Sequence, residues 1–185
     1  YKAVVSQGFT LDGQGRKMSK SLGNVIDPNK VCDEMGADII RLWVASVDTS
    51  TDVAIDHEIL KRTSDAYRRF RNTFRFLLSE LYDFDPSTDT VAVEELLPVD
   101  ACALARMGEV HAKVEQAYAE YRFNGVYRAL YDYVVTELSN VYLDVIKDRT
   151  YCDAPTSRGR RSAQTVLAAI LEMLLHDLQP ILAFT

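Results

Sequence analysis

Apolar residues recur at helical spacing through most of the chain after residue 55. In the first such stretch every seventh residue is large and apolar, namely Leu60, Tyr67, Phe74 and Leu81. This repeat predicts a long helix that begins after Asp56 and packs lengthwise against its neighbours. Similar stripes predict further helices over residues 100–121, 126–147 and 160–178. Because the last stretch is apolar almost all round, we expect it at the centre of an antiparallel four-helix bundle.

The first 55 residues are different, because Gly and Ser are concentrated there and the apolar runs are short. Residues 2–11 are rich in Val, Phe and Thr, and turn-forming residues follow at 12–15, which together predict a β-hairpin. Pro28 and a left-handed Gly36 bound a predicted short helix, and a second one follows over 37–47. Aspartates stand at the start of three predicted helices and are expected to cap them, namely Asp27, Asp56 and Asp100.

The pattern therefore predicts a mainly α protein. We expect a small β-hairpin segment over residues 1–55, followed by a helical bundle domain over residues 56–185. The first two long helices are joined by residues 83–100, an acidic stretch without Lys or Arg. Such a stretch is typical of a solvated connector.

Composition and charge narrow the classes of function. Hydrophobic residues make up 48% and charged residues 26% of the chain, and the net charge of −6 argues against non-specific coating of nucleic acid. The three cysteines form no CxxC pair, and we assign the three histidines no metal-binding role, so a reduced, cytoplasmic chain without a metal site is expected. No targeting or membrane segment is expected. The chain opens within a predicted strand without a methionine and stops at an apolar stretch over 181–185, which suggests a piece of a longer protein.

Residues 17–21, with the sequence Lys-Met-Ser-Lys-Ser, carry the clearest chemical signal. Two ammonium groups three residues apart and two hydroxyl groups, with glycines on either side, predict a mobile loop that binds a polyphosphate. A solvated lysine–serine turn is the ordinary alternative for a surface loop. Five specified residues arise by chance on the order of once in 10⁴ sequences of this length, which favours the functional interpretation.

This pentapeptide resembles the second signature of the class I aminoacyl-tRNA synthetases. Residues 8–12, Gly-Phe-Thr-Leu-Asp, are similar to the arm that precedes the loop in that family. The string Arg41–Ser46, with Asp48, resembles the isoleucyl branch more than the valyl, leucyl or methionyl branches. The resemblance covers essentially the whole chain. It implies the end of the catalytic domain with its stem-contact segment over 1–55, and a C-terminally truncated anticodon-binding domain over 56–185.

The resemblance implies an ATP-dependent ligase that activates isoleucine and transfers it to tRNA(Ile), with Mg²⁺ accompanying ATP. By position, Lys20 matches the lysine that stabilises the departing pyrophosphate and Lys17 the supporting lysine, while Ser19 and Ser21 contact phosphate or assist loop closure. The resemblance also implies a cytoplasmic monomer without a membrane partner, and it places any zinc site outside this chain. Because the His-x-Gly-His signature is absent, we expect these 185 residues alone to form no adenylate.

Two groups of basic residues are candidates for contact with tRNA phosphates. The first lies on the first long helix and contains Arg68, Arg71 and Arg75. The second brackets the loop before the last helix and contains Lys147, Arg149, Arg158, Arg160 and Arg161. The alternative is a solvated helix face, with Arg71 or Arg161 paired to the acidic connector. Two other functions remain open, namely another class I ligase and a stand-alone helical RNA-binding module.

Overall fold

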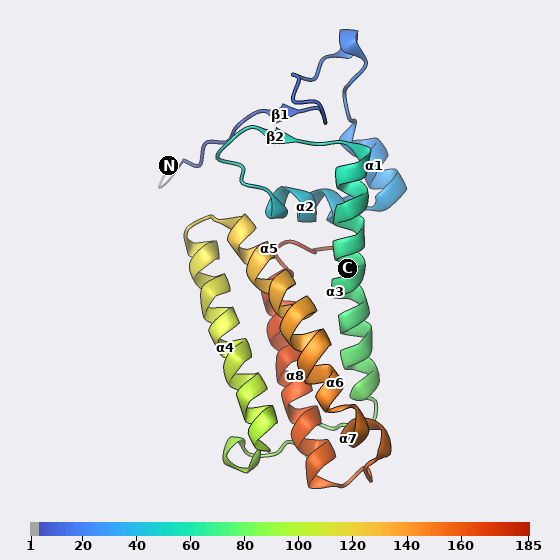
Figure 1. The fold of residues 1–185 in the computed structure, drawn as a ribbon, viewed down its shortest axis with the longest axis vertical. Coiled ribbons are helices and arrows are strands. Elements are labelled where there is room, and N and C mark those ends of the chain that lie inside the picture. The colour runs from blue at the N-terminus through green and yellow to red at the C-terminus, as the bar shows by residue number, and fades with distance from the viewer. Residues whose placement is uncertain (1–3) are drawn as a thin grey trace.

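The long helices lie side by side and alternate in direction, so they form the predicted antiparallel bundle (Figure 1). The structure is a computed structural model and describes residues 4–185. The bundle consists of four long helical segments. Three of them are single helices, namely α3 (His57–Glu80), α4 (Pro98–Ala119) and α8 (Arg158–Leu178). The fourth is continuous from α5 (Phe123–Asp132) through η3 (Tyr133–Tyr142) to α6 (Leu143–Val145). The mainly α fold is thereby confirmed. The predicted helix over 126–147 differs in detail, because η3 is a π-helical stretch.

The apolar stripes read from the sequence form the core of this bundle. Phe70 and Leu77 of α3, Met107 of α4 and Leu138 of η3 are essentially inaccessible to solvent. Helix α8 packs against both α3 and α4 and buries Leu167 among them. Of the described helices α8 buries the most residues, as its all-round apolar character indicated. It packs mainly on α3, α4 and α7 (Lys147–Cys152), however, and so occupies one corner of the bundle rather than its centre. Within residues 4–185 we find no helix that combines the length and the apolar character needed to cross a membrane.

Two of the three expected helix caps are present. The carboxylate of Asp27 accepts a hydrogen bond from the backbone N–H of Asn29 at 2.9 Å and starts α1 (Pro28–Met35). The carboxylate of Asp56 accepts one from the backbone N–H of Ile59 at 2.7 Å and starts α3. The expected role of Asp100 is wrong, because α4 already begins at Pro98 and the Asp100 side chain is fully buried.

The expected β-hairpin is reduced to a single antiparallel bridge between Leu11 and Lys17. Strand β1 (Thr10–Leu11) instead pairs in parallel with β2 (Val53–Ala54), a segment far along the chain. The expected turn over 12–16 is present, because the backbone N–H of Asp12 donates to the Arg16 carbonyl and that of Arg16 donates to the Asp12 carboxylate, but after Lys17 the chain leaves the strand. The part of the expected arm before residue 4 lies outside the described residues.

Gly8 allows the close approach of these two segments. A Cβ atom at this position would lie 2.2 Å from the backbone oxygen of Thr51. The backbone N–H of Gly8 donates to the carbonyl of Thr49 at 2.9 Å. Only a residue without a side chain fits here, which explains the glycine that opens the segment over 8–12.

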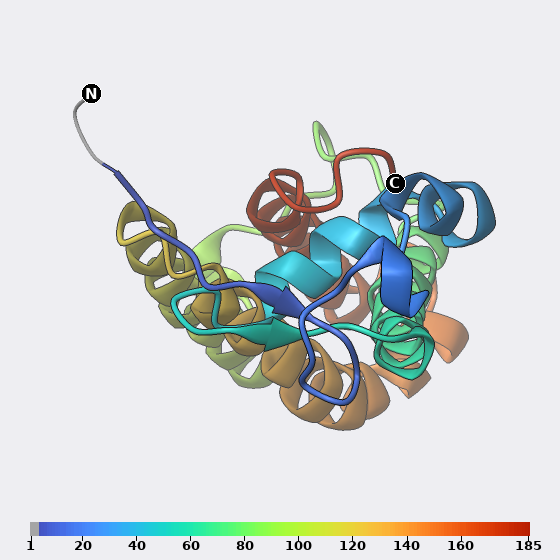
Figure 2. The same ribbon diagram turned by 90° about the horizontal axis from the view of Figure 1, so that it is seen from above.

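A smaller layer lies across one end of the bundle (Figure 2). It consists of α1, α2 (Ala37–Ser46) and the two strands, and its own core contains Val31, Ile39, Trp43 and Ile55. Leu60 in the first turns of α3 belongs to the same small core. Helix α3 therefore links both cores. Gly36, between α1 and α2, has φ +91° and ψ 150°, which is not the left-handed helical conformation expected for it.

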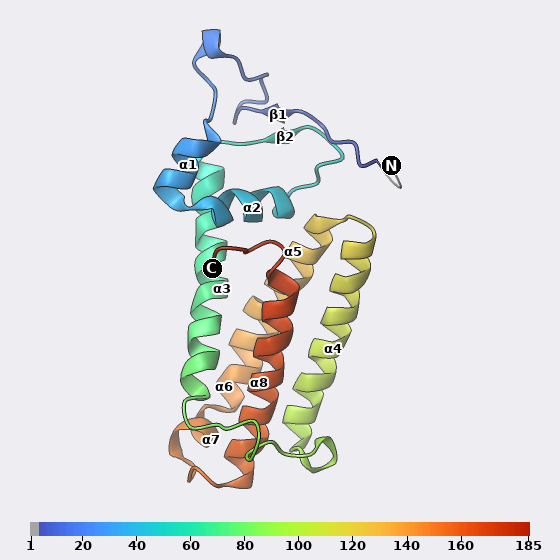
Figure 3. The same cartoon turned by 180° about the vertical axis from the view of Figure 1, so that it is seen from behind.

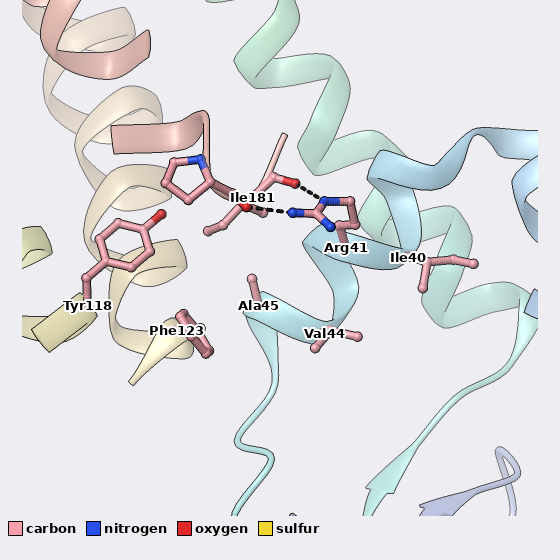
Figure 4. A pocket seen from close by; sticks show the side chains of 8 residues that line it. Ile40, Arg41, Val44, Ala45, Tyr118, Phe123 and Ile181 are labelled. Atoms are coloured by element: carbon pink, nitrogen blue, oxygen red, sulfur yellow. Dashed lines mark hydrogen bonds between the residues drawn. The ribbon is translucent and has the colours of Figure 1, made fainter. Parts of the chain in front are cut away.

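The residues after α8 return to α2. The Arg41 guanidinium donates to the carbonyl oxygens of Pro180 and Ile181 at 2.6 and 2.8 Å (Figure 4). Beside this contact lies a hollow of about 300 Å³ between α2, the start of α5 and this tail. The tail thus fixes the small layer to the end of the bundle.

The acidic connector runs along the opposite end of the bundle, where it joins α3 to α4 (Figure 3). It contains a short turn, η2 (Val93–Glu95), and most of its side chains are exposed, as expected. It is nevertheless held on α8, because the backbone N–H groups of Val91 and Leu97 donate to the hydroxyls of Thr165 and Ser162.

Candidate functional site

The lysine–serine loop forms the tip of the molecule beyond the small layer (Figure 1). The side chains of Lys17 and Lys20 are exposed, and Lys20 begins the short turn η1 (Lys20–Leu22). The ammonium group of Lys17 lies 6.0 Å from the centre of the Phe9 ring. Among the described residues, neither ammonium group has a carboxylate within 4.0 Å. Both charges are therefore available to an anion.

Asn24 holds the loop in shape. Its side-chain oxygen accepts a hydrogen bond from the backbone N–H of Ser19 at 2.9 Å. Its amide nitrogen donates to a carboxylate oxygen of Asp12 at 2.9 Å and to the Lys17 carbonyl at 3.3 Å. The Asn24 side chain thus connects both lysine-bearing parts of the loop to the turn before it.

The Asp12 carboxylate is the main hydrogen-bond acceptor in this arrangement. It is buried and accepts hydrogen bonds from Asn24 and from the backbone N–H groups of Gln14 and Arg16. The Arg16 side chain also donates to it at 2.9 Å. These hydrogen bonds, led by that of Asn24, hold the pKa of the Asp12 carboxyl well below its usual range. Asp12 therefore stays ionised, and the contacts that shape the loop persist from neutral to moderately acidic pH.

The two hydroxyl groups take part in the loop's own structure. The Ser19 hydroxyl accepts from the backbone N–H of Leu22 at 3.3 Å and lies 3.1 Å from the Ser21 hydroxyl. Gly23 ends the turn in the left-handed conformation, with φ +65°. Ser19 is therefore the cap of η1, and its contact with phosphate stays a prediction.

The basic residues of α3 form an exposed surface. Arg68, Arg71 and Arg75 all point to solvent. Arg68 lies 3.1 Å from Asp65, an exposed pair one helical turn away. Within residues 4–185, no carboxylate lies within 4.0 Å of Arg71 or Arg75. The alternative in which Arg71 pairs with the acidic connector is therefore not observed.

Three arginines of the second group are used inside the protein. Arg149 binds Asp100 with both terminal nitrogens, at 2.8 and 2.9 Å. Arg160 is only 4% exposed and pairs with Asp83 at 3.0 Å, and Arg161 pairs with Asp89 of the connector at 3.1 Å. Their guanidinium groups hold the connector and the helix ends together, and contact of these three arginines with tRNA stays a prediction. For Arg161 the structural alternative is the observed one.

Two members of the second group remain at the surface. Lys147 is exposed and lies 2.7 Å from Asp144, three residues earlier on the chain. Arg158 is exposed and donates to the backbone carbonyl of Glu95 at 2.7 Å. Neither side chain is buried, so contact with tRNA stays a prediction for both.

Asp100 is the centre of a buried polar cluster that the sequence patterns missed. Besides Arg149, it accepts hydrogen bonds from the Tyr142 hydroxyl at 2.8 Å and the Ser162 hydroxyl at 2.6 Å. Burial and the adjacent Asp100 carboxylate raise the pKa of Tyr142 far above its usual range. The cluster joins α4 to η3, α7 (Lys147–Cys152) and α8. Its partners are 42 to 62 residues away, so no local motif signals it.

Two family models match the chain. The model described as "tRNA synthetases class I (I, L, M and V)" matches residues 1–56, and the model "Anticodon-binding domain of tRNA ligase" matches residues 100–185. Together they include the lysine–serine loop over residues 17–21 and three of the four long helical segments of the bundle.

Curated relatives match the chain from end to end. An isoleucine–tRNA ligase of Desulforudis audaxviator is 56% identical over all 185 residues, and one of Symbiobacterium thermophilum is 55% identical. The chain spans about a fifth of the length of these relatives (20% of each).

Solved structures share the fold. A LeuRS of Agrobacterium radiobacter K84, in a ternary complex with tRNA and LeuAMS, matches with a TM-score of 0.72 and 23% identity over 96% of this chain and 20% of its own. A methionyl-tRNA synthetase of Mycobacterium tuberculosis, in complex with methionyl-adenylate, matches with a TM-score of 0.70 and 19% identity over 97% of this chain and 36% of its own. At these identities the likeness concerns the fold alone.

Proposed function

The chain belongs to the class I tRNA synthetases, and we propose that the protein carrying it activates isoleucine with ATP and transfers it to tRNA(Ile). The observation that carries the choice of isoleucine is the 55–56% identity to isoleucine–tRNA ligases along the entire chain. Within this function, we propose that residues 1–55 supply the phosphate-binding loop and that residues 56–185 form a tRNA-binding helical domain. The alternative of a stand-alone RNA-binding module is disfavoured by the match of residues 1–56 to the synthetase model.

The proposed first step is the formation of an aminoacyl-adenylate. A carboxylate oxygen of isoleucine attacks the α-phosphorus of ATP. The bond from that phosphorus to the oxygen bridging to the β-phosphate breaks, and pyrophosphate leaves with the electron pair. In the second step a ribose hydroxyl of the tRNA attacks the activated carbonyl and AMP leaves.

The loop lysines act on the first of these steps. Negative charge grows on the pyrophosphate as the bond breaks, and the exposed Lys20, supported by Lys17, neutralises it. Donors placed where charge develops stabilise the transition state by about 3 kcal/mol each. The hydrogen bonds of Asn24 to Asp12 and to the backbone of Ser19 hold the two lysines in the required positions.

Mg²⁺ bound with ATP would supply further positive charge for the phosphates. This cation prefers oxygen ligands, above all carboxylates. The carboxylate nearest the loop, Asp12, already accepts hydrogen bonds from Arg16 and Asn24 with both oxygens. The loop therefore offers no carboxylate for Mg²⁺.

The function is tested by pyrophosphate exchange into ATP with the full-length protein. We expect exchange that depends on isoleucine and is much weaker with leucine, methionine or valine. An equal or faster reaction with one of these three amino acids would assign the chain to another class I ligase, and absence of exchange with all four would contradict the ligase function.

We propose that tRNA lies along the exposed basic surface of α3, formed by Arg68, Arg71 and Arg75. Replacing Arg71 and Arg75 with alanine should weaken binding of tRNA(Ile) and flatten its salt dependence. Each phosphate contact contributes about 0.7–0.9 to the slope of log affinity against log salt, so the double variant should lose about 1.5. Filter binding at several salt concentrations measures this slope.

The matched control removes two exposed lysines elsewhere. Lys30 lies on α1, and Lys113 lies on α4, which Figures 1 and 3 show on the side of the bundle away from α3. The Lys30→Ala, Lys113→Ala variant has the same net charge as the Arg71→Ala, Arg75→Ala variant. If both double variants change the slope equally, the α3 surface has no special role.

We further propose that the protein is a monomer and is located in the cytoplasm. A reducing compartment agrees with the three cysteines, which are free in the structure.

A further inference from the structure

The packing of α4 against α8 brings two of the three histidines together. His111 lies on α4, and His176 lies with Asp177 in the last turn of α8. The two imidazole rings meet edge to face, with their centres 5.7 Å apart. Nδ1 of His111 lies 2.8 Å and Nδ1 of His176 lies 3.4 Å from the same Asp177 oxygen. No local motif indicates this cluster, because 65 residues separate the two histidines.

The Asp177 carboxylate is incompletely satisfied. Its side chain is only 2% exposed, yet within residues 4–185 Oδ2 has no hydrogen-bond partner. A buried carboxylate oxygen without a donor is unfavourable, and such oxygens are commonly paired or bound to a metal ion. This oxygen is therefore a second, independent sign of a ligand at the cluster.

We propose that His111, His176 and Asp177 bind a divalent first-row transition metal ion, with Zn²⁺ the expected one. One ligand atom from each of the three residues lies within 4.8 Å of the others. Ligand atoms around a tetrahedral zinc ion, at about 2.0–2.2 Å from it, lie about 3.3 Å apart, so only small side-chain adjustments are needed. Imidazole and carboxylate are ligands that Zn²⁺ accepts, and a water molecule completes the site.

Neighbouring residues hold the ligands in place. The other ring nitrogen of His111, Nε2, lies 3.7 Å from a Glu115 carboxylate oxygen on the same helix. The Tyr118 hydroxyl donates to the backbone carbonyl of Asp177 at 2.7 Å. Such outer contacts orient metal ligands in known zinc sites.

A bound ion would link α4 to the C-terminal end of α8. Because it binds the folded chain, it raises the unfolding temperature by mass action. At a zinc concentration 100 times the dissociation constant, we expect an increase of about 5–10 °C for a chain of this length. This site is independent of the proposed ligase function, since neither depends on the other's residues.

The experiment uses the 185-residue chain, Zn²⁺, and His176→Asn as the test variant. His176 is 73% exposed, so this variant should fold like the wild type. Isothermal titration and thermal unfolding should give one Zn²⁺ per chain for the wild type and at least tenfold weaker binding for His176→Asn. His57→Asn is the matched control, because His57 is exposed at the start of α3 and should leave binding unchanged.

Two further measurements keep the proposal testable. Co²⁺ should give the visible absorption of a nitrogen- and oxygen-bound ion in the wild type and not in His111→Asn, whereas Mg²⁺ should not raise the unfolding temperature. The proposal is overturned if the wild type binds no Zn²⁺ at 100 μM, or if His176→Asn and His57→Asn bind it as the wild type does. The second result would point to the cysteines.

Discussion

Replacing Lys20 with alanine in the full-length protein is expected to slow the formation of isoleucyl-adenylate by about 100-fold or more. The reason is the place of this lysine in the structure. It is exposed at the tip of the loop, and among the described residues no carboxylate competes for its charge. Loss of one donor to a developing negative charge costs about 3 kcal/mol, which corresponds to roughly a hundredfold in rate.

The effect should fall on the rate and leave the affinity for isoleucine nearly unchanged. Charge on the departing pyrophosphate is larger in the transition state than in bound ATP, so the contact acts mainly on the reaction step. Pyrophosphate exchange and single-turnover adenylate formation measure the two quantities. Lys30→Ala is the control, because Lys30 is also an exposed lysine and lies on α1. Exchange by Lys20→Ala at the wild-type rate would refute the assigned role.

The second large effect is expected from Asp100→Ala, which should lower the free energy of unfolding by about 3–5 kcal/mol. Asp100 is fully buried and accepts hydrogen bonds from Arg149, Tyr142 and Ser162. Its removal leaves the Arg149 charge without its partner and two hydroxyl groups without acceptors, all within the protein. For a chain of 185 residues the unfolding temperature should fall by about 6–20 °C.

Urea unfolding followed by circular dichroism measures this loss. Asp65→Ala is the matched control, because Asp65 also pairs with an arginine, Arg68, but both side chains are more than half exposed. A pair of that kind contributes about 1 kcal/mol or less. If the two variants were equally stable, the buried cluster would not be the connection between the helices that we describe.

Local features of the sequence predicted the parts of the fold that depend on short-range contacts. The caps at Asp27 and Asp56 each require a backbone N–H only two or three residues away. The heptad spacing of apolar residues in α3 likewise reports one helix face, on which Leu60 is buried and Tyr67 and Phe74 are half-buried against the core. These predictions succeeded because the physical cause lies within one or two helical turns.

The errors concern contacts between distant segments. Strand β1 pairs with residues more than 40 positions away, and nothing between residues 2 and 17 indicates that partner. Asp100 stands at a plausible capping position, but its side chain turns inward to Arg149, which is 49 residues away. A charged residue in a sequence can equally well serve the surface or a buried pair.

In the candidate site, too, the features carried by adjacent residues were predicted and the contacts between distant residues were not. The lysines of the loop were identified from five adjacent residues, and the structure adds the Asp12–Asn24 hydrogen bond that supports them. Arginines before and within α8 were expected at a binding surface, whereas Arg160 is buried and Arg161 binds the connector. A high density of arginines does not by itself distinguish a nucleic-acid-binding surface from internal ion pairs. The acidic connector over residues 83–100 was the feature of the sequence that indicated an internal partner.

The most direct test of the central claim is a crystal structure of the full-length protein with ATP and an unreactive isoleucine analogue. We predict that the ammonium group of Lys20 lies within hydrogen-bonding range, about 2.7–3.2 Å, of an oxygen of the β- or γ-phosphate, with Lys17 beside it. A complex in which ATP is fully bound and both ammonium groups remain more than about 6 Å from every phosphate oxygen would contradict the account.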